Sequence, residues 1–244
     1  ASLAASGGIL GVIIPPSLIF IIYGIATSTS IGELFIAGII PGLLIALTLS
    51  ISNSLVCRYS TWALVDKKLF SFRKLLSALW HAKWGLGAPL IILGGIYGGI
   101  FTPTEAAAVA VFYVFLVETV INKELGIRDI ISSLTRAAIV TGILGPIIAF
   151  SILFGETLAI LRVPGNVVNF FISMSVGHTE SVFMIIFVLL IMGCILEPIA
   201  AILVIMPILL PIGMELGFDP VHFGVFVVST LSVGFITPPV GINL

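Results

Sequence analysis

Charged residues are scarce in this 244-residue chain. They make up only 9% of the sequence, whereas about a quarter of the residues in a soluble domain are charged. Hydrophobic residues make up 59%, against roughly half or less in soluble proteins. This composition excludes an ordinary water-soluble enzyme and is typical of a chain that crosses a lipid bilayer several times.

An excess of positive charge is also missing. Lys and Arg together number 10 and Asp and Glu number 11, which gives a net charge of −1. The chain therefore lacks the basic surface with which proteins bind nucleic acid. The two cysteines, Cys57 and Cys194, lie in or beside apolar runs, so we expect neither a disulfide framework nor a metal site from them.

Motifs that carry enzyme chemistry are not found in the sequence. It has no Gly-rich phosphate-binding loop, no Cys/His metal cluster and no Ser-His-Asp order that a membrane topology could bring together. We therefore expect no catalytic residue and no cofactor. Because the nucleotide-binding motif is missing, the energy for any transport would come from an ion gradient or from a partner protein.

Long uncharged segments, by contrast, are abundant. A helix needs about 20 mostly apolar residues to cross the hydrocarbon core. The predicted fold is an all-α integral membrane protein, a multi-span helical bundle. The segments expected to cross or enter the membrane are 4–28, 31–56, 85–101, 105–121, 137–160, 181–214 and 219–244.

Prolines interrupt three of these segments. Pro15-Pro16 lies in the first, Gly145-Pro146 in the fifth and Thr237-Pro238-Pro239 in the last. Proline has no N–H to donate, so it leaves a helix carbonyl without its partner. Lipid cannot satisfy that carbonyl, and each break must therefore face protein or a water-filled cavity. We predict an interrupted helix at all three places.

The segment 181–214 predicts a different structure. It is uncharged except for Glu197, which Pro198 follows. Each limb of about 16 residues would be about 24 Å long, which is short for a full crossing. We therefore predict a re-entrant helical hairpin with Glu197 near its tip.

The distribution of cations predicts the orientation. Residues 58–84 hold six of the ten Lys and Arg residues, whereas none follows Arg162. By the positive-inside rule, 58–84 and the loop 122–136 are cytoplasmic and 163–180 is external. Within 58–84, the run LFSFRKLLSALWHAKW has apolar residues at helical spacing, which favours a helix on the membrane surface. A polybasic binding site for a partner is the alternative for this run.

Two proline-broken segments resemble each other. The run LGVIIPPS pairs with VGFITPPVG, so that Gly11 aligns with Gly234. The predicted topology sends the two segments across the membrane in opposite directions, which indicates inverted repeats and a transporter binding site. A chance recurrence is the other explanation. We expect residues 1–57 to end the first repeat, 58–84 to form a connecting loop with an interfacial helix, and 85–244 to form the second repeat.

Three stretches resemble a known family. They are GGILGVIIPPSLIFIIYGIATSTSIGELFIAGIIPGLL, GGIYGGIFTPTEAAAVAVFY, and ILEPIAAILVIMPILLPIGMELGFDPVHFGVFVVSTLSVGFITPPVGINL. Together they are similar to the large membrane subunit of tripartite ATP-independent periplasmic (TRAP) transporters. The runs TPTEAAAVAV and DPVHFGV…ITPPVGIN are highly specific.

That resemblance implies a multi-pass elevator-type secondary transporter of the bacterial inner membrane. It implies Na⁺-coupled import of a small organic acid of the C4-dicarboxylate, keto acid or sialic acid class. The implied partners are a small membrane subunit and a periplasmic substrate-binding protein. The family has two re-entrant hairpins, of which 181–214 corresponds to the second; the first would precede Ala1, so we expect the chain to be a fragment. The tip position, often Asp in the family, is Glu197 here.

The helix breaks offer the oxygen ligands that Na⁺ prefers. The first break frees carbonyls near Gly11 and presents the Ser17 hydroxyl. The last break presents the Thr237 hydroxyl and the carbonyls around Gly241, and Glu197 would add a negative charge. We predict that these five residues bind Na⁺ and that Ser17 and Thr237 also contact substrate.

The other acids have plainer interpretations. Glu105 lies in the first turn of a predicted helix that Thr104 could cap, so a helix-start role and a role in substrate binding are both open. Glu33 is expected to be a helix cap. Glu118 and Glu156 lie near the ends of spans and are expected to reach the membrane interface.

Two alternatives to a TRAP-type subunit remain at this stage. One is a related Na⁺-coupled anion transporter that works without a binding protein. That family uses Ser-Asn-Thr motifs at its breaks, whereas this chain has Pro-Pro-Ser and Thr-Pro-Pro. The other is a channel or a membrane-embedded enzyme that uses Glu105 and Glu197 as its carboxylates.

Overall fold

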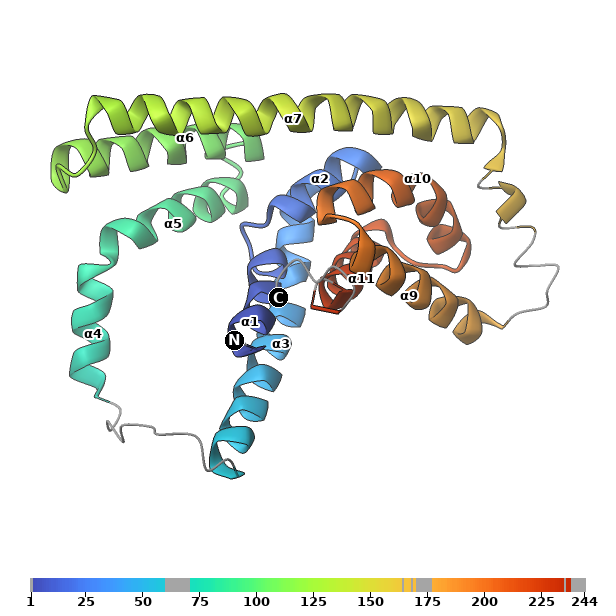
Figure 1. Cartoon of the computed structure of the whole chain (residues 1–244), viewed down its shortest axis with the longest axis horizontal. Helices are drawn as coiled ribbons and strands as arrows, with labels where there is room; N and C mark the ends of the chain where they lie inside the picture. The colour runs from blue at the N-terminus through green and yellow to red at the C-terminus, as the bar shows by residue number, and fades with distance from the viewer. Residues whose placement is uncertain are drawn as a thin grey trace. The chain divides into compact units, whose positions relative to one another are not determined.

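The computed structural model describes residues 2–59, 71–163, 165–167, 169, 177–234 and 236–237. Every regular element among them is a helix (Figure 1). The chain forms two compact units, one made of residues 1–53 and 143–244 and the other of residues 54–142.

Among the described residues, the larger unit contains two helix pairs, one further complete helix, and parts of two long helices that continue into the other unit. The described elements of this unit are α1 (Ser2–Ile13), α2 (Leu18–Thr27), α3 (Ile31–Tyr59), α9 (His178–Ile195), α10 (Pro198–Glu215) and α11 (Pro220–Gly234), together with the second half of α7 (Ile127–Ile160).

The first interrupted helix is confirmed. α1 ends at Ile13 and α2 begins at Leu18, and the two helices meet at an angle of 48° across the Pro15-Pro16 pair. The peptide bond between these two prolines is cis. Two successive residues without an N–H remove two backbone hydrogen bonds, and the helix does not continue through that loss.

The predicted helical hairpin is also present as two helices. α9 and α10 have 18 residues each and are separated by a break at Leu196 and Glu197. The two limbs diverge after the tip, since α9 packs chiefly against α11 and α10 packs chiefly against α2. α11 also contacts α1 and α2, so the broken helix, the hairpin and α11 share one core.

A close backbone contact joins α9 to α11. A Cβ atom added to Gly234 would lie 2.8 Å from the Cα of Gly193, and one added to Gly193 would lie 2.8 Å from the carbonyl oxygen of Leu231. Only glycine permits such an approach of two backbones. At the other end of the same pair, the ring of His178 at the start of α9 stacks on Phe218 just before α11, with 6.2 Å between ring centroids. The two helices are therefore parallel and end together.

Aromatic and aliphatic side chains fill the core between these helices. Phe20 and Tyr23 from α2 and Leu231 from α11 are fully buried, as is Met206 from α10 apart from 1% of its surface. The Tyr23 hydroxyl donates a hydrogen bond of 2.8 Å to the carbonyl of Pro220, which fixes the start of α11 against α2. A buried tyrosine needs such a partner because its hydroxyl loses water on burial.

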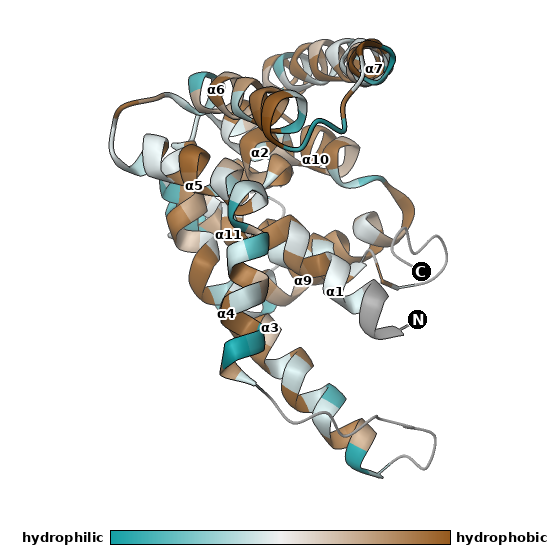
Figure 2. Ribbon diagram, turned by 90° about the vertical axis from the view of Figure 1, so that its left-hand side faces the viewer, coloured by the Kyte–Doolittle hydropathy of each residue, from teal (hydrophilic) through white to brown (hydrophobic). Residues whose placement is uncertain are grey.

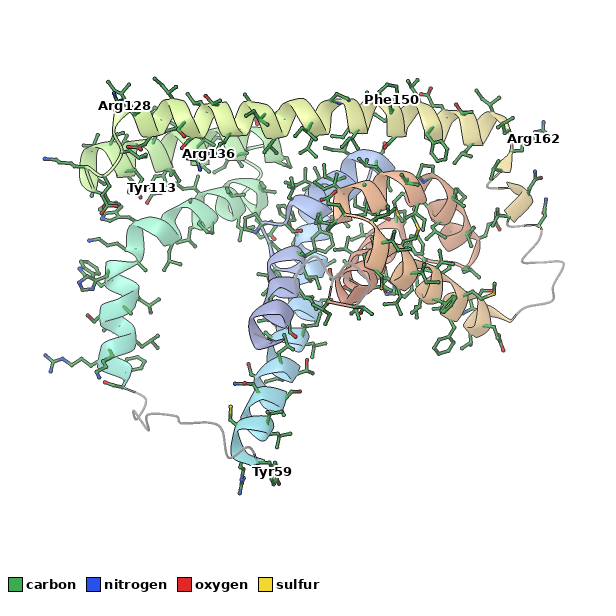
Figure 3. All side chains as sticks on the ribbon, viewed as in Figure 1. Tyr59, Tyr113, Arg128, Arg136, Phe150 and Arg162 are labelled. Atoms are coloured by element: carbon green, nitrogen blue, oxygen red, sulfur yellow. The ribbon has the colours of Figure 1, made fainter. Side chains whose placement is uncertain are left out.

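The smaller unit consists of α4 (Phe72–His81), α5 (Lys83–Tyr97), α6 (Pro103–Leu116), the π-helical turn η1 (Val117–Ile121), the end of α3 and the first part of α7. α5 packs along α6, and the Tyr113 hydroxyl of α6 donates a 3.0 Å hydrogen bond to the carbonyl of Trp84 (Figure 3).

The expected interfacial helix is shorter than predicted. α4 is a ten-residue amphipathic helix with no buried residue, as the pattern indicated, but it ends at His81 and Trp84 belongs to α5. Residues 60–70 of the same loop lie outside the described residues.

The predicted interruption at Gly145-Pro146 is wrong. α7 runs without a break through Pro146 for 34 residues and begins at Ile127, inside the stretch 122–136 that was expected to be a loop. A single proline removes only one backbone hydrogen bond, and the helix continues past it. The same holds for Pro41 in α3 and for Pro207 and Pro211, one turn apart in α10.

The helices have the lengths and surfaces of a membrane protein. Among the described residues, five helices are long and apolar enough to span a bilayer, or six when α1 and α2 are counted together. Hydrophobic residues cover most of the helices (Figure 2), and no residue of α7 is buried. The protein is thus an all-α integral membrane protein. The expected crossing at 85–101 is the 15-residue α5, about 22 Å long and short for a span.

The contact between α9 and α11 leads to a stability prediction. We expect Gly193→Ala to lower the free energy of unfolding by about 1–3 kcal/mol, because the new methyl group meets backbone atoms that cannot rotate away. Thermal unfolding in detergent measures the change. Gly145→Ala is the control, since a Cβ there meets nothing within 4 Å, and it should be neutral or stabilising. Equal midpoints for Gly193→Ala and wild type would show that the two helices are not in contact.

Candidate functional site

Ser17 closes the first helix break. Its hydroxyl donates a hydrogen bond to the carbonyl of Val12 in α1 and accepts one of 3.3 Å from the N–H of Phe20 in α2. The side chain is fully buried. Ser17 is therefore the N-cap of α2 and ties the two half-helices together. Its predicted contact with ion or substrate stays a prediction.

Gly11 lies in the last turn of α1 and is exposed, with open space where a Cβ would stand. The carbonyls of a helix's last four residues have no partner inside the helix. In α1 the carbonyl of Leu10 still accepts a 2.8 Å hydrogen bond from the N–H of Ile14, whereas Pro15 has no N–H to give to that of Gly11; Ser17 provides a partner for that of Val12. Gly11 is thus placed where the sequence predicted unpaired carbonyls, and its role as an ion ligand stays a prediction.

Thr237 lies just beyond α11. Its N–H donates to the carbonyl of Gly234 at 2.9 Å and its hydroxyl donates to the carbonyl of Val233 at 3.0 Å. The side chain is exposed. Because these bonds use only hydrogens, the lone pairs of the hydroxyl oxygen remain available to a cation. Pro238, Pro239 and Gly241 lie outside the described residues, so the prediction for Gly241 stays as it was made.

Glu197 caps α10 at the tip of the hairpin. One carboxylate oxygen accepts a 3.2 Å hydrogen bond from the N–H of Ala200, with Pro198 at the first helical position. The side chain is exposed, and among the residues that the structure describes it has no ion-pair partner. The second carboxylate oxygen is therefore free to meet a cation.

Helix ends converge near these residues. α9 and α11 are parallel and in contact at Gly193 and Gly234, so their C-terminal ends lie side by side. Each helix C-terminus carries about half a negative charge on its last carbonyls. Glu197 follows the end of α9 and Thr237 follows the end of α11. The two ends together form an electronegative, oxygen-rich region, which is the environment that a hard cation such as Na⁺ prefers.

Glu105 belongs to the other unit and has a clear local role. Its carboxylate accepts hydrogen bonds of 2.8 Å from both the N–H and the hydroxyl of Thr102, and its own N–H donates to the Thr102 hydroxyl. This is a complete capping box at the start of α6. The expectation that Thr104 caps this helix is wrong, because Pro103 takes the first helical position and leaves the cap to Thr102. A contact of Glu105 with substrate stays a prediction.

Sequence reasoning placed Glu156 at the membrane interface, and the structure adds a feature that it missed. Glu156 lines a cavity of about 350 Å³ with residues of α2 and α10. Two prolines one turn apart in α10, Pro207 and Pro211, were the available signal.

Comparison with known proteins identifies the family. The whole chain, residues 1–244, matches the family described as tripartite ATP-independent periplasmic transporter, DctM component. The chain belongs to this family. Its relatives are named as permease proteins of transporters, so the alternatives of a membrane-embedded enzyme and of a separate anion-transporter family are not supported.

Curated relatives cover the chain from end to end. It is 40% identical over 246 residues to the isethionate TRAP transporter permease protein DctMQ of Oleidesulfovibrio alaskensis, covering 100% of this chain and 38% of that protein. It is 39% identical over 244 residues to the C4-dicarboxylate TRAP transporter large permease protein DctM of Pseudomonas aeruginosa, covering 100% and 57%. It is 35% identical over 242 residues to the sialic acid TRAP transporter large permease protein SiaM of Vibrio cholerae, covering 99% and 56%. The chain thus spans between a third and three fifths of the length of these relatives.

The bridge that Ser17 makes leads to a second prediction. Ser17→Ala removes the cap of α2 and leaves the N–H of Phe20 buried without a partner, so we expect a loss of about 0.5–2 kcal/mol in the free energy of unfolding. Ser50→Ala is the control, because the Ser50 hydroxyl is exposed and only bonds back to Ala46 within α3. Thermal unfolding of both variants decides the matter, and equal losses would mean that Ser17 does not stabilise the break.

Proposed function

We propose that this chain is part of the large membrane subunit of a TRAP transporter that imports a small organic acid with Na⁺. Within that proposal, it acts in the bacterial inner membrane with a small membrane subunit and a periplasmic substrate-binding protein. The observation that carries the proposal is the packing of the broken helix α1–α2, the hairpin α9–α10 and α11 into one unit. Interrupted helices of this kind hold ion and substrate sites in secondary transporters.

The helix ends offer sites of suitable charge for both the coupling ion and the substrate. Cations are favoured at helix C-termini and anions at helix N-termini. The paired ends of α9 and α11, with Glu197 and Thr237 beyond them, suit Na⁺. The N-terminus of α2 begins at the break after Pro15-Pro16, in a helix that packs against α10, and it suits a negatively charged substrate group.

The relatives' names support an anionic substrate. They name isethionate, C4-dicarboxylates, sialic acid and, for a 36% identical protein of Escherichia coli, 2,3-diketo-L-gulonate. A carboxylate or sulfonate group is common to all of them. For this chain we propose a small carboxylate or sulfonate as cargo. The relative named DctMQ is a longer protein, of which this chain covers 38%. We propose that this chain works beside a small membrane subunit.

The overall test is uptake by the full-length protein, reconstituted with its small subunit and binding protein, using a panel of labelled organic acids. The proposal expects uptake of at least one acid that requires both a Na⁺ gradient and the binding protein. Uptake that is equal with a choline gradient would contradict Na⁺ coupling, and uptake without the binding protein would contradict the tripartite assignment.

A prediction for Thr237 follows from its free lone pairs. Thr237→Val keeps the shape of the side chain and removes the oxygen, so we expect a several-fold higher Na⁺ concentration for half-maximal uptake, because a hydrogen bond of ordinary strength is worth about 0.5–1.5 kcal/mol. Thr135→Val is the matched control, since the Thr135 hydroxyl is also exposed and bonds back along its helix to Ile131. An unchanged Na⁺ dependence in both variants would remove Thr237 from the ion site.

A prediction for Glu197 tests the charge at the hairpin tip. Glu197→Gln retains an oxygen that can cap α10 but removes the negative charge, so we expect Na⁺-driven uptake to fall at least tenfold while the protein still folds. Glu33→Gln is the control, because Glu33 is an exposed acid in the first turn of α3 and should transport normally. Wild-type uptake and Na⁺ dependence in Glu197→Gln would show that its charge has no part in coupling.

A further inference from the structure

A cavity away from the helix breaks has the composition of a second cation site. It measures about 350 Å³ and is bordered by α2, the second half of α7 and α10, all within the larger unit. At roughly 30 Å³ per water molecule, this volume holds a small ion with part of its hydration shell. The residues that line it are Ala26, Ser151, Ile152, Gly155, Glu156, Ala159, Leu203 and Pro207.

Among the described residues that line the cavity, Glu156 is the only charged one. It directly follows the uncharged stretch 137–155, and the chain remains apolar or neutral until Arg162. Within the described part of the chain, Glu156 has neither a hydrogen-bond donor nor an ion-pair partner. A carboxylate in such surroundings is costly unless something neutralises it. The cavity beside it provides room for that counter-charge.

Neutral oxygen atoms border the same cavity. Ser151 lies on α7 five residues before Glu156, and its hydroxyl has no partner among the described residues. In α10, Pro207 has no N–H to give to the carbonyl of Leu203, and Pro211 has none to give to the carbonyl of Pro207. Leu203 and Pro207 both line the cavity. Glu156, Ser151 and the two residues with freed carbonyls, Leu203 and Pro207, thus all line one space.

The packing of α7 on α10 places these groups together. A Cβ added to Gly155 would lie 3.0 Å from Cγ of Pro207, so the absence of a side chain lets α7 approach the proline-bearing face of α10. Glu156 is the next residue. The contact therefore brings this part of α7 close to the turn of α10 whose backbone hydrogen bonds are missing.

We propose that this cavity binds one hard monovalent cation, Na⁺, with the Glu156 carboxylate as its charged ligand and Ser151 and the carbonyls of Leu203 and Pro207 as neutral ligands. A single carboxylate balances a single positive charge, and oxygen ligands are those that a hard cation takes. The site is separate from the one proposed near Glu197 and Thr237, because it is bordered by α2, α7 and α10 rather than by the ends of α9 and α11.

The experiment is equilibrium binding of radioactive sodium to the purified full-length protein in complex with its small subunit, at constant ionic strength. We expect Glu156→Gln to bind one Na⁺ fewer per protein than wild type. Glu118→Gln is the matched control, since Glu118 is also an acid near the end of a candidate span but already accepts a hydrogen bond from Asn122. It should bind as many ions as wild type.

Ser151→Ala is a second variant that tests the same site if Glu156→Gln folds poorly. It removes one neutral ligand at an accessible position, so we expect the full number of bound ions with a several-fold weaker affinity for one of them. Thr237→Val should weaken a different ion and leave this one unchanged. The double variant Ser151→Ala, Thr237→Val should therefore show two weakened ions, which separates this inference from the proposed function.

Two results would overturn the inference. One is an unchanged Na⁺ count in a folded Glu156→Gln protein together with unchanged affinities in Ser151→Ala. The other is a loss of pH-dependent thermal stability in Glu156→Gln without any change in Na⁺ binding, which would show that the carboxylate holds a proton and not a metal ion.

Discussion

The backbone contact between Gly193 and Gly234 sets the geometry on which the rest of the larger unit depends. Because neither residue has a side chain, α9 and α11 approach until their backbones touch, and they end at the same level. Their C-terminal carbonyls then act together on anything placed beyond them. Glu197 and Thr237 are placed there by the chain itself, one after each helix.

Unsatisfied backbone carbonyls are the second common feature of this unit. In hydrocarbon each of them needs a partner from the protein, from water or from an ion. At the first break the Ser17 hydroxyl provides one such partner, which joins α1 to α2 across the prolines. In α10 the two prolines leave carbonyls within an otherwise continuous helix, next to a cavity and a carboxylate. The same shortage of donors thus gives a rigid bridge in one place and a proposed ion site in another.

Several features could be predicted from residues alone. The double proline at Pro15-Pro16 ends a helix wherever the chain is placed, since two successive N–H groups are missing. The break at Glu197-Pro198 and a helix with Glu105 in its first turn were readable for similar local reasons, although the helix starts at Pro103 and the cap proved to be Thr102. Pro146 was misjudged because a single proline removes one bond, and whether the helix then continues depends on the bonds around it.

The sequence by itself determined that the protein lies in the membrane, that it is helical, and that Pro15-Pro16 breaks the first helix, because hydrophobicity and a missing N–H act locally. Only the tertiary structure decided which helix ends meet. The glycine contact between α9 and α11, the burial of Ser17 and the neighbours of Glu156 each join residues distant in the chain. No local pattern specifies such contacts, because they depend on how whole helix faces pack together.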